Sequence, residues 1–308
     1  MIAVSLIGGL GNQMFQYAAG KALAERHGVS LALDLSGFPH DEERRSFLLD
    51  RWCVPKADLA KAPEPGAEKP ASNVVRSRWR QRVDRVLGQG GSPDLARAPN
   101  PNHYHEPHFQ YDEAFEALGP ETALSGYFQS ERYFSEIGER LRDFFQPRDP
   151  LSPGAQDIAE RIASTEVAVS VHIRRGDFVK NPARVRFHGW LEDAYYRRAL
   201  NVLQGVLKSE MTFFVFSDDA VAAEAVLDFV PAANLVHVRG DPDRPWEDLA
   251  LMARCHHHVV ANSSFSWWGA WLNPSSDKTV IVPRAWFTPI GLRQQNTCDL
   301  WPADWILL

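Results

Sequence analysis

Short hydrophobic runs alternate with longer amphipathic stretches along most of this chain. Near the N-terminus, apolar runs at 2–7 and 29–35 flank residues 15–28, where apolar positions recur at helical spacing up to a glycine. Short apolar runs bounded by turn residues are typical of buried strands. A strand, a loop, a helix and a second strand in this order predict a parallel sheet.

The same alternation returns in the second half of the chain. The spacing predicts strands at 167–173, 212–217, 234–238, 257–262 and 279–283, and helices at 191–207, 219–230, 246–255 and 265–272. Between the halves, "QPRDPLSPGAQ" (146–156) has the prolines of a linker. The sequence therefore predicts an α/β protein with two Rossmann-like domains, residues 1–150 and 151–308.

Residues 54–102 interrupt this pattern, because prolines, glycines and charges replace the apolar runs. Within them, residues 73–87 place apolar side chains at helical spacing among five arginines. Two interpretations stay open for this basic helix. It is either a solvated helix lying on the N-terminal domain, or a peripheral contact with an acidic membrane surface or a lipid-linked substrate.

Composition narrows the class of protein. The chain has 308 residues, 44% of them hydrophobic, and a formal net charge of −6, which is typical of a soluble protein and argues against one that coats nucleic acid. Three scattered cysteines without a C-x-x-C pair argue against a disulfide framework or a zinc site. Without a basic leader or an apolar run of membrane length, we expect a cytoplasmic location, or a peripheral one at the inner face of the membrane.

Polar side chains follow three of the predicted strands in the second half. Ligands of parallel sheets bind beyond the carboxyl ends of the strands. Paired arginines suit phosphate oxygens, a carboxylate suits the N–H groups of a base such as guanine, and serines at a helix start suit a diphosphate. The sequence predicts a nucleotide diphosphate site built from His172, Arg174, Arg175, Asp177, Ser217, Asp218, Asp219, Asn262, Ser263, Ser264 and Ser266.

Each of these motifs also has a purely structural interpretation. The arginines could form surface ion pairs, and "SDD" (217–219) or "NSS" (262–264) could cap helices. The loop "GGLGNQ" (8–13) lacks the third glycine of a dinucleotide fingerprint. It is either a tight turn or a loop that approaches a ligand through Gly9, Gly11, Asn12 and Gln13.

Two further motifs resemble metal ligands but fit structural roles better. The D-x-D of residues 241–243 lies in a proline-rich turn, where aspartate is common. The histidines of residues 256–258 lead into an apolar strand, where neighbouring side chains point to opposite faces. We therefore expect no metal site.

Several long stretches make the sequence familiar. The segments "GGLGNQMFQYAAGKALA", "GYFQSERYF", "VHIRRGDFV", "FSDD" and "CHHHVVANSSFSWWGAWL" resemble bacterial α-1,2-fucosyltransferases of glycosyltransferase family 11. The resemblance implies a GT-B-like fold, with two Rossmann-like domains facing across a cleft. It also implies inverting transfer of L-fucose from GDP-β-L-fucose without an obligatory metal or other cofactor. The acceptor would be the 2-hydroxyl of a terminal galactose in an oligosaccharide or lipid-linked glycan precursor.

The resemblance also suggests roles for individual residues. It places His172, Arg174, Arg175 and Asn12 at the donor, and the chemistry of the reaction adds transition-state stabilisation by the two arginines. Asp177 is the first choice for the general base, ahead of His172, Asp34 and His40. Two alternatives stay open: a transferase of another linkage or GDP-sugar, and a binding protein for sugar nucleotides or glycans without turnover.

Overall fold

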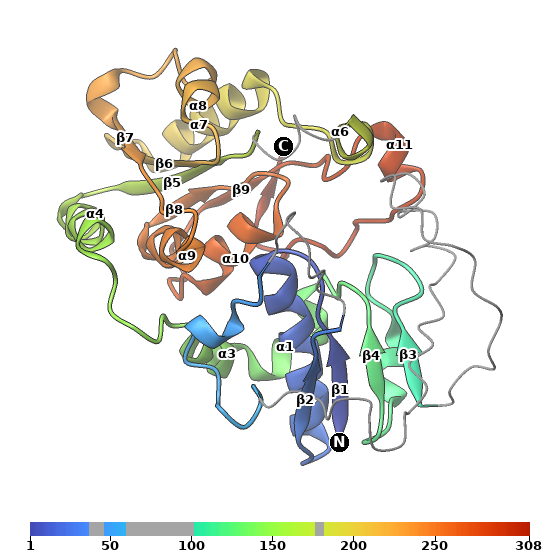
Figure 1. Cartoon of the computed structure of the whole chain (residues 1–308). Coiled ribbons are helices and arrows are strands. Elements are labelled where there is room, and N and C mark those ends of the chain that lie inside the picture. The colour runs from blue at the N-terminus through green and yellow to red at the C-terminus, as the bar shows by residue number, and fades with distance from the viewer. Residues whose placement is uncertain (37–45, 60–101, 176–181) are drawn as a thin grey trace. The chain divides into compact units, whose positions relative to one another are not determined.

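The computed structural model describes residues 1–36, 46–59, 102–175 and 182–308 (Figure 1). These residues form two compact units, each built around a parallel sheet. Residues 60–101 of the predicted insertion, with the basic helix at 73–87, lie outside the described residues, as do Asp177 and His40. Within the described part, none of the helices has the length and apolar composition that crossing a membrane requires.

The first unit contains a four-stranded sheet in the order β2-β1-β4-β3. Its regular elements are β1 (Ile2–Ser5), α1 (Leu10–Arg26), β2 (Leu31–Asp34), β3 (His103–His105), β4 (Ala123–Ser125) and α3 (Gly138–Phe144). The described residues of this unit also contain four 3₁₀ turns: Leu49–Arg51, Glu113–Ala117, Glu131–Tyr133 and Ser135–Ile137. Helix α1 packs closely on the sheet at Gly20, where an added Cβ would lie 3.0–3.2 Å from atoms of Leu31 and Val4.

The second unit contains a six-stranded sheet in the order β10-β9-β8-β5-β6-β7. Its strands are β5 (Ala168–Ile173), β6 (Thr212–Ser217), β7 (Leu235–Val238), β8 (His257–Val259), β9 (Val280–Val282) and β10 (Ile306–Leu307). Its helices are α4 (Pro153–Ser164), α6 (Pro182–His188), α7 (Asp193–Leu207), α8 (Ala220–Val226), α9 (Pro245–Arg254), α10 (Ser264–Leu272) and α11 (Pro289–Leu292), with a 3₁₀ turn at Ala232–Asn234.

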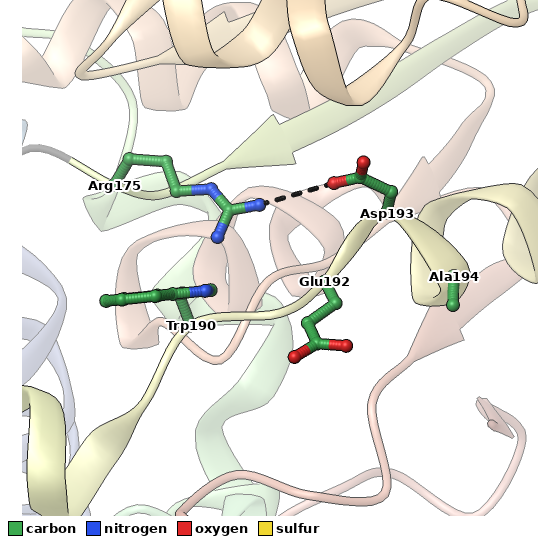
Figure 2. Close-up of a pocket in the computed structure, with 5 residues that line it drawn as sticks. All are labelled: Arg175, Trp190, Glu192, Asp193 and Ala194. Carbon is green, nitrogen blue, oxygen red and sulfur yellow. Dashed lines mark ion pairs between the residues drawn. The ribbon is translucent and has the colours of Figure 1, made fainter.

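Alternation along the central strands gives this sheet two packed faces. In β6, Phe213 and Val215 join a buried cluster with α7, whereas Phe214 and Phe216 join another with α4 and α9. Strand β5 is buried along its whole length. Just past its end, Arg175 faces Asp193 at the start of α7 (Figure 2). The predicted α/β architecture with two parallel sheets is confirmed.

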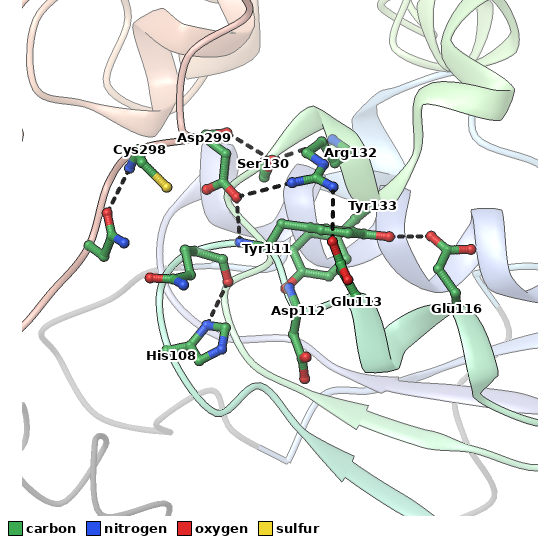
Figure 3. A network of polar contacts seen from close by, with 12 residues as sticks. His108, Tyr111, Asp112, Glu113, Glu116, Ser130, Arg132, Tyr133, Cys298 and Asp299 are labelled. Carbon is green, nitrogen blue, oxygen red and sulfur yellow. Dashed lines mark hydrogen bonds and ion pairs between the residues drawn. The ribbon is translucent and has the colours of Figure 1, made fainter.

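The division of the chain differs from the predicted domains in one segment. The change of unit falls between Phe145 and Gln146, but Gln295–Leu300 returns to the first unit. Figure 3 shows the contacts responsible: the Asp299 carboxylate accepts the N–H of Tyr111 at 2.9 Å, and Ser130 Oγ donates to the Asp299 carbonyl at 2.8 Å. Sequence position alone had assigned this segment to the second domain.

The predicted glycine loop is shorter in the structure. Helix α1 begins at Leu10, with Gly9 as its N-cap, so Gly11, Asn12 and Gln13 belong to its first turns. The turn itself occurs at Gly8, whose φ of +82° lies in the left-handed region that glycine adopts readily. The sequence prediction began the helix later, because apolar spacing becomes regular only at Phe15.

Candidate active site

The carboxyl end of β5 brings His172 to helix α10. His172 is buried, and its Nδ1 lies 2.8 Å from Ser266 Oγ. Tyr196 of α7 donates to the His172 carbonyl from the other face at 3.1 Å. Both ring and backbone are therefore held by the fold, which fixes the direction in which Arg174 leaves the strand.

Arg174 reaches the N-terminus of α10. Its Nη1 donates to Ser263 Oγ at 3.3 Å, and the same oxygen accepts the N–H of Phe265 at 3.3 Å. Ser263 is thus the N-cap of α10, as one interpretation predicted, and it also contacts the predicted arginine. A guanidinium beside the positive end of a helix forms a region that attracts anions. Ser264, the first residue of α10, is half-buried at the same end.

Arg175 turns toward α7 instead. Its backbone N–H donates to Asp218 Oδ1 at 2.7 Å. Its guanidinium lies 5.7 Å from the centre of the Trp190 ring and 3.7 Å from Asp193 Oδ1. Figure 2 shows the guanidinium between these two side chains, in a pocket of about 280 Å³ that Glu192 and Ala194 complete. The adjacent arginines thus diverge, which separates their charges.

The motif "SDD" has divided roles. Asp219 caps α8 by accepting the N–H of Ala222 at 3.0 Å, and Ser217 Oγ accepts the N–H of Asp219 at 3.0 Å. These two residues match the capping interpretation. Asp218 is exposed and joins the ends of β5 and β6 through Arg175. Asp218 is therefore the member of the motif that lies at the arginines.

Asn262 is used inside the fold. Its Nδ2 donates to the carbonyls of His188, Gly189 and Trp286 at 3.1–3.3 Å, and the residue is 6% exposed. These bonds tie the segment after α6 and the segment after β9 to the start of α10. The side chain of Asn262 therefore supports the site rather than presenting donors to a ligand.

The residues of the glycine loop differ in whether a ligand can reach their side chains. Gln13 is fully buried; its Nε2 donates to the carbonyls of Gly8 and Ser46, at 3.1 and 2.9 Å, and its Oε1 accepts the N–H of Leu48. Asn12 is half-buried, and its Oδ1 accepts a hydrogen bond from Gln129 at 2.9 Å. Asn12 is thus the side chain of the loop that a ligand can reach.

Gln16 and Glu106 support this loop but escaped the sequence analysis. Gln16 joins the loop to the segment after β4, because its Oε1 accepts the N–H of Ile7 and its Nε2 donates to the Gly126 carbonyl. The buried Glu106 carboxylate accepts the N–H groups of Tyr127 and Phe128 at 2.7 and 3.1 Å. Burial raises the pKa of Glu106 to about 8. Gln16 lies within the predicted helix, where the sequence does not reveal its hydrogen bonds. Glu106 directly follows β3, a strand that the sequence did not predict.

Asp248 is a second carboxyl group that the sequence analysis missed. It lies in α9 against Gly240, where an added Cβ would be 2.1 Å from Asp248 Oδ2. Burial raises the pKa of Asp248 to about 7, with smaller contributions from Glu247 and Asp241. Gly240 closely follows the carboxyl end of β7. The sequence did offer one signal for Asp248: an aspartate among the apolar residues of a predicted helix.

The two metal-like motifs have structural roles in the described fold. Asp241 Oδ1 accepts the N–H of Asp243 at 2.9 Å, which forms a local turn. His256 and His257 accept backbone N–H groups through Nδ1, and His258 is hydrogen-bonded to Ser170 and Asn273. Within the described residues, no three histidine, cysteine, aspartate or glutamate side chains group in a way that would hold a metal ion.

Known proteins of similar sequence show the family of this chain. The family model described as Glycosyl transferase family 11 matches residues 103–302. The chain belongs to glycosyltransferase family 11. Over 309 residues it is 30% identical to the α-1,2-colitosyltransferase of Escherichia coli, covering 99% of this chain and 98% of that protein. It is also 31% identical over 307 residues to the O-antigen biosynthesis glycosyltransferase WbnK of Escherichia coli, covering 96% and 98%.

Solved structures support the fold of this family 11 glycosyltransferase. POFUT1 in complex with GDP-fucose aligns with a TM-score of 0.50 at 14% identity, covering 91% of this chain and 97% of POFUT1. A variant of Arabidopsis thaliana FUT1 in complex with GDP aligns with a TM-score of 0.50 at 12% identity, covering 94% and 72%. The predicted GT-B-like fold and the predicted family are confirmed.

Proposed function

We propose that this glycosyltransferase moves L-fucose from GDP-β-L-fucose to the 2-hydroxyl of a terminal galactose, with inversion at the anomeric carbon. The observation that carries the proposal is the position of Arg174 and Arg175 at the end of β5. One guanidinium lies at the N-terminus of α10, and the other lies in a pocket. The names of the relatives, an α-1,2-colitosyltransferase and, at 25% identity, a galactoside α-(1,2)-fucosyltransferase of Saimiri sciureus, support the linkage.

The arginines match the charge that this reaction develops. The bond between the anomeric carbon and the β-phosphate oxygen breaks as the acceptor oxygen forms its new bond from the opposite face. GDP leaves with additional negative charge, and the acceptor hydroxyl loses a proton. Preorganised guanidinium groups and a helix N-terminus stabilise that charge in the transition state more than in the ground state. We therefore propose that the reaction proceeds without an obligatory metal or other cofactor.

Other donor contacts follow from the same geometry. The Ser263–Ser264 end of α10 would hold the diphosphate together with Arg174, and the exposed Asp218 carboxylate would accept N–H groups of the guanosine end. Asn12, in the first unit, is the proposed donor contact from the glycine loop. Six other predicted residues would act by holding these contacts in place: His172, Ser217, Asp219, Asn262, Ser266 and Gln13.

The proton acceptor is proposed among the four residues considered from the sequence, of which His40 and Asp177 lie outside the described residues. His172 is buried with Nδ1 on Ser266, which makes it a poor base. The Asp34 carboxylate accepts hydrogen bonds from Ser5 Oγ and the Ser36 N–H, both at 3.0 Å. Asp177 remains our proposed base because it follows the arginines in sequence. We further propose a cytoplasmic enzyme acting on a galactose-terminated oligosaccharide or lipid-linked precursor.

A second donor has specific support. The relative that matches 99% of this chain is named for transfer of colitose, which is fucose without its 3-hydroxyl. GDP-colitose is therefore the alternative donor, with the same arginines at the same diphosphate. Initial rates with the two donors at equal concentration decide between them.

The test is release of GDP from GDP-L-fucose in the presence of galactose-terminated acceptors, with and without EDTA. We expect release that depends on the acceptor, survives EDTA, and yields an α-1,2 product by NMR spectroscopy. Arg175→Ala should lower kcat/KM by about 10²–10³-fold, as loss of an oxyanion donor does. Loss of release with EDTA would contradict metal independence, and tight GDP binding without release for any acceptor would favour a binding protein.

A further inference from the structure

The pocket beside Arg175 is lined by three chemical types of side chain (Figure 2). Trp190 supplies a flat apolar ring, Arg175 a guanidinium, and Glu192 and Asp193 two carboxylates. Sites for drug-sized ligands are typically about 300–1,000 Å³. A volume of about 280 Å³ therefore suits one small ring better than a whole nucleotide.

Trp190 is unusual among the tryptophans of this chain. Of the nine that the structure describes, eight are buried, whereas Trp190 is 44% exposed. A single exposed aromatic ring is ordinary on a protein surface. This ring, however, has a guanidinium 5.7 Å from its centre and forms a pocket wall. A rigid apolar face beside a phosphate-binding group is suited to a sugar whose hydroxyls point away from it.

Asp193 pairs with Arg175 in a way that a ligand can undo. The separation is 3.7 Å, and the side chain of Asp193 is 64% exposed, whereas that of Arg175 is 13% exposed. A long ion pair with a solvated carboxylate contributes little to stability, whereas bidentate bonds between arginine and phosphate are strong. A diphosphate can thus take over the guanidinium at little cost. The released carboxylate then stays at the pocket wall as an acceptor for sugar hydroxyls.

We propose that this pocket receives the hexosyl group of the donor and that Trp190 selects 6-deoxy sugars by packing against the C6 methyl group. The inference rests on the proposed function: if Arg175 binds the β-phosphate, the sugar bonded to that phosphate lies beside the guanidinium. Fucose and colitose both carry this methyl group. A donor with a 6-hydroxyl would place that hydroxyl against the face of the indole ring, which offers it no hydrogen-bond acceptor, and this is less favourable than a methyl group there.

The decisive comparison uses two donors, GDP-L-fucose and GDP-L-galactose, which differ only by the C6 hydroxyl. A methyl group or an added hydroxyl placed against an apolar surface changes kcat/KM by about 10–200-fold. We expect the wild type to prefer GDP-L-fucose by a factor in this range. Trp190→Ala should reduce the preference about tenfold or more, whereas Trp190→Phe, which keeps an aromatic face, should largely retain it. An unchanged preference in Trp190→Ala would overturn the proposal.

Binding measured by calorimetry separates this role from others. GDP lacks the sugar, so Trp190→Ala should leave its Kd within about twofold of wild type while weakening GDP-L-fucose about tenfold. Equal weakening of both ligands would mean that Trp190 stacks on the base, and a higher acceptor KM with an unchanged donor preference would place the acceptor here; either result overturns the inference. Because binding needs no acceptor, a wild type without transfer would overturn the proposed function while this comparison still tests the pocket.

Discussion

Gln129 donates a hydrogen bond from Nε2 to Oδ1 of Asn12 at 2.9 Å, and it thereby joins residues 117 positions apart. The segment that carries Gln129 is held by Glu106, and Gln129 itself is 6% exposed. Fixing Oδ1 leaves the amide nitrogen of Asn12 over Gly8, where an added Cβ would lie 2.7 Å from it. The orientation of Asn12 is therefore set by a residue of a different motif.

This relationship predicts that Gln129 acts on the donor only through Asn12. Gln129→Ala should raise the KM for GDP-L-fucose, and Asn12→Ala should raise it at least as much. The double variant should be no worse than Asn12→Ala, because coupled contacts show interaction energies of about 0.5–3 kcal/mol. Steady-state kinetics of the four proteins measures this coupling. Additive effects would contradict it, whereas an Asn12→Ala variant with wild-type kinetics would refute the donor role of Asn12.

Gly8→Ala should lower both stability and donor affinity. A non-glycine residue in the left-handed region costs about 1–2 kcal/mol, and here the new Cβ would also collide with the Asn12 amide. We expect a lower Tm together with a raised donor KM. Gly205→Ala is the matched control: Gly205 lies inside α7 with open space around it, so alanine should stabilise the protein by about 0.5–1 kcal/mol. A Gly8→Ala variant as stable as wild type would contradict the strain argument.

Substitutions of Arg174 and of the helix cap Ser263 should have different effects, the first on activity and the second on stability. Arg174→Lys keeps the charge but loses the planar fork, so we expect kcat/KM to fall at least tenfold with little change in Tm. Ser263→Ala should cost about 1 kcal/mol of stability through the lost N-cap. Arg197→Ala, on the exposed face of α7, controls for the loss of a surface arginine. Equal activity of Arg174→Lys and wild type would exclude bidentate recognition by this residue.

The carboxyl group of Asp248 should make stability depend on pH. Its pKa is raised from 3.8 to about 7 by burial. Between these values the folded state keeps a proton that the unfolded state has lost, so the free energy of unfolding should fall as the pH rises through this window. Asp248→Asn should remove that part of the fall, and Asp157→Asn, at an exposed position of α4, should not. Urea denaturation at several pH values from 4 to 8 measures the difference; parallel curves for wild type and Asp248→Asn would contradict the raised pKa.

Sequence patterns predicted the strands that lie in apolar runs and missed those that do not. Strand β6 coincides with the predicted residues 212–217, because the four apolar residues Phe213–Phe216 between turn signals leave little ambiguity. Strands β3 (HYH) and β4 (ALS) lie in no apolar run, whereas the equally short β8 and β9 lie in the runs at 257–262 and 279–283. Helix α1 begins before its apolar spacing does, because Gly9 and Gly11 carry no side chains that reveal the helix.

The contacts of the candidate site were also predictable only in part. The proximity of Arg175 to Asp218 follows from the rule that parallel strands end at one edge, and it was predictable. Trp190, in the segment before α7, and Asp193, the first residue of α7, approach Arg175, and no period or motif connects them with the arginines. Similarly, Asp219 and Ser263 carry cap-forming side chains for which the sequence allows two roles, and only the hydrogen bonds of each side chain identify the cap.

The return of Gln295–Leu300 to the first unit has a consequence for synthesis on the ribosome. The Asp299 contacts with Tyr111 and Ser130 cannot form until residue 299 has been translated. The N-terminal unit therefore lacks its last segment, Gln295–Leu300, while the other unit is synthesised. It can bind this segment only after residue 300 has left the ribosomal exit tunnel. The first unit therefore reaches its final structure only after residues 146–294 of the second unit have been synthesised.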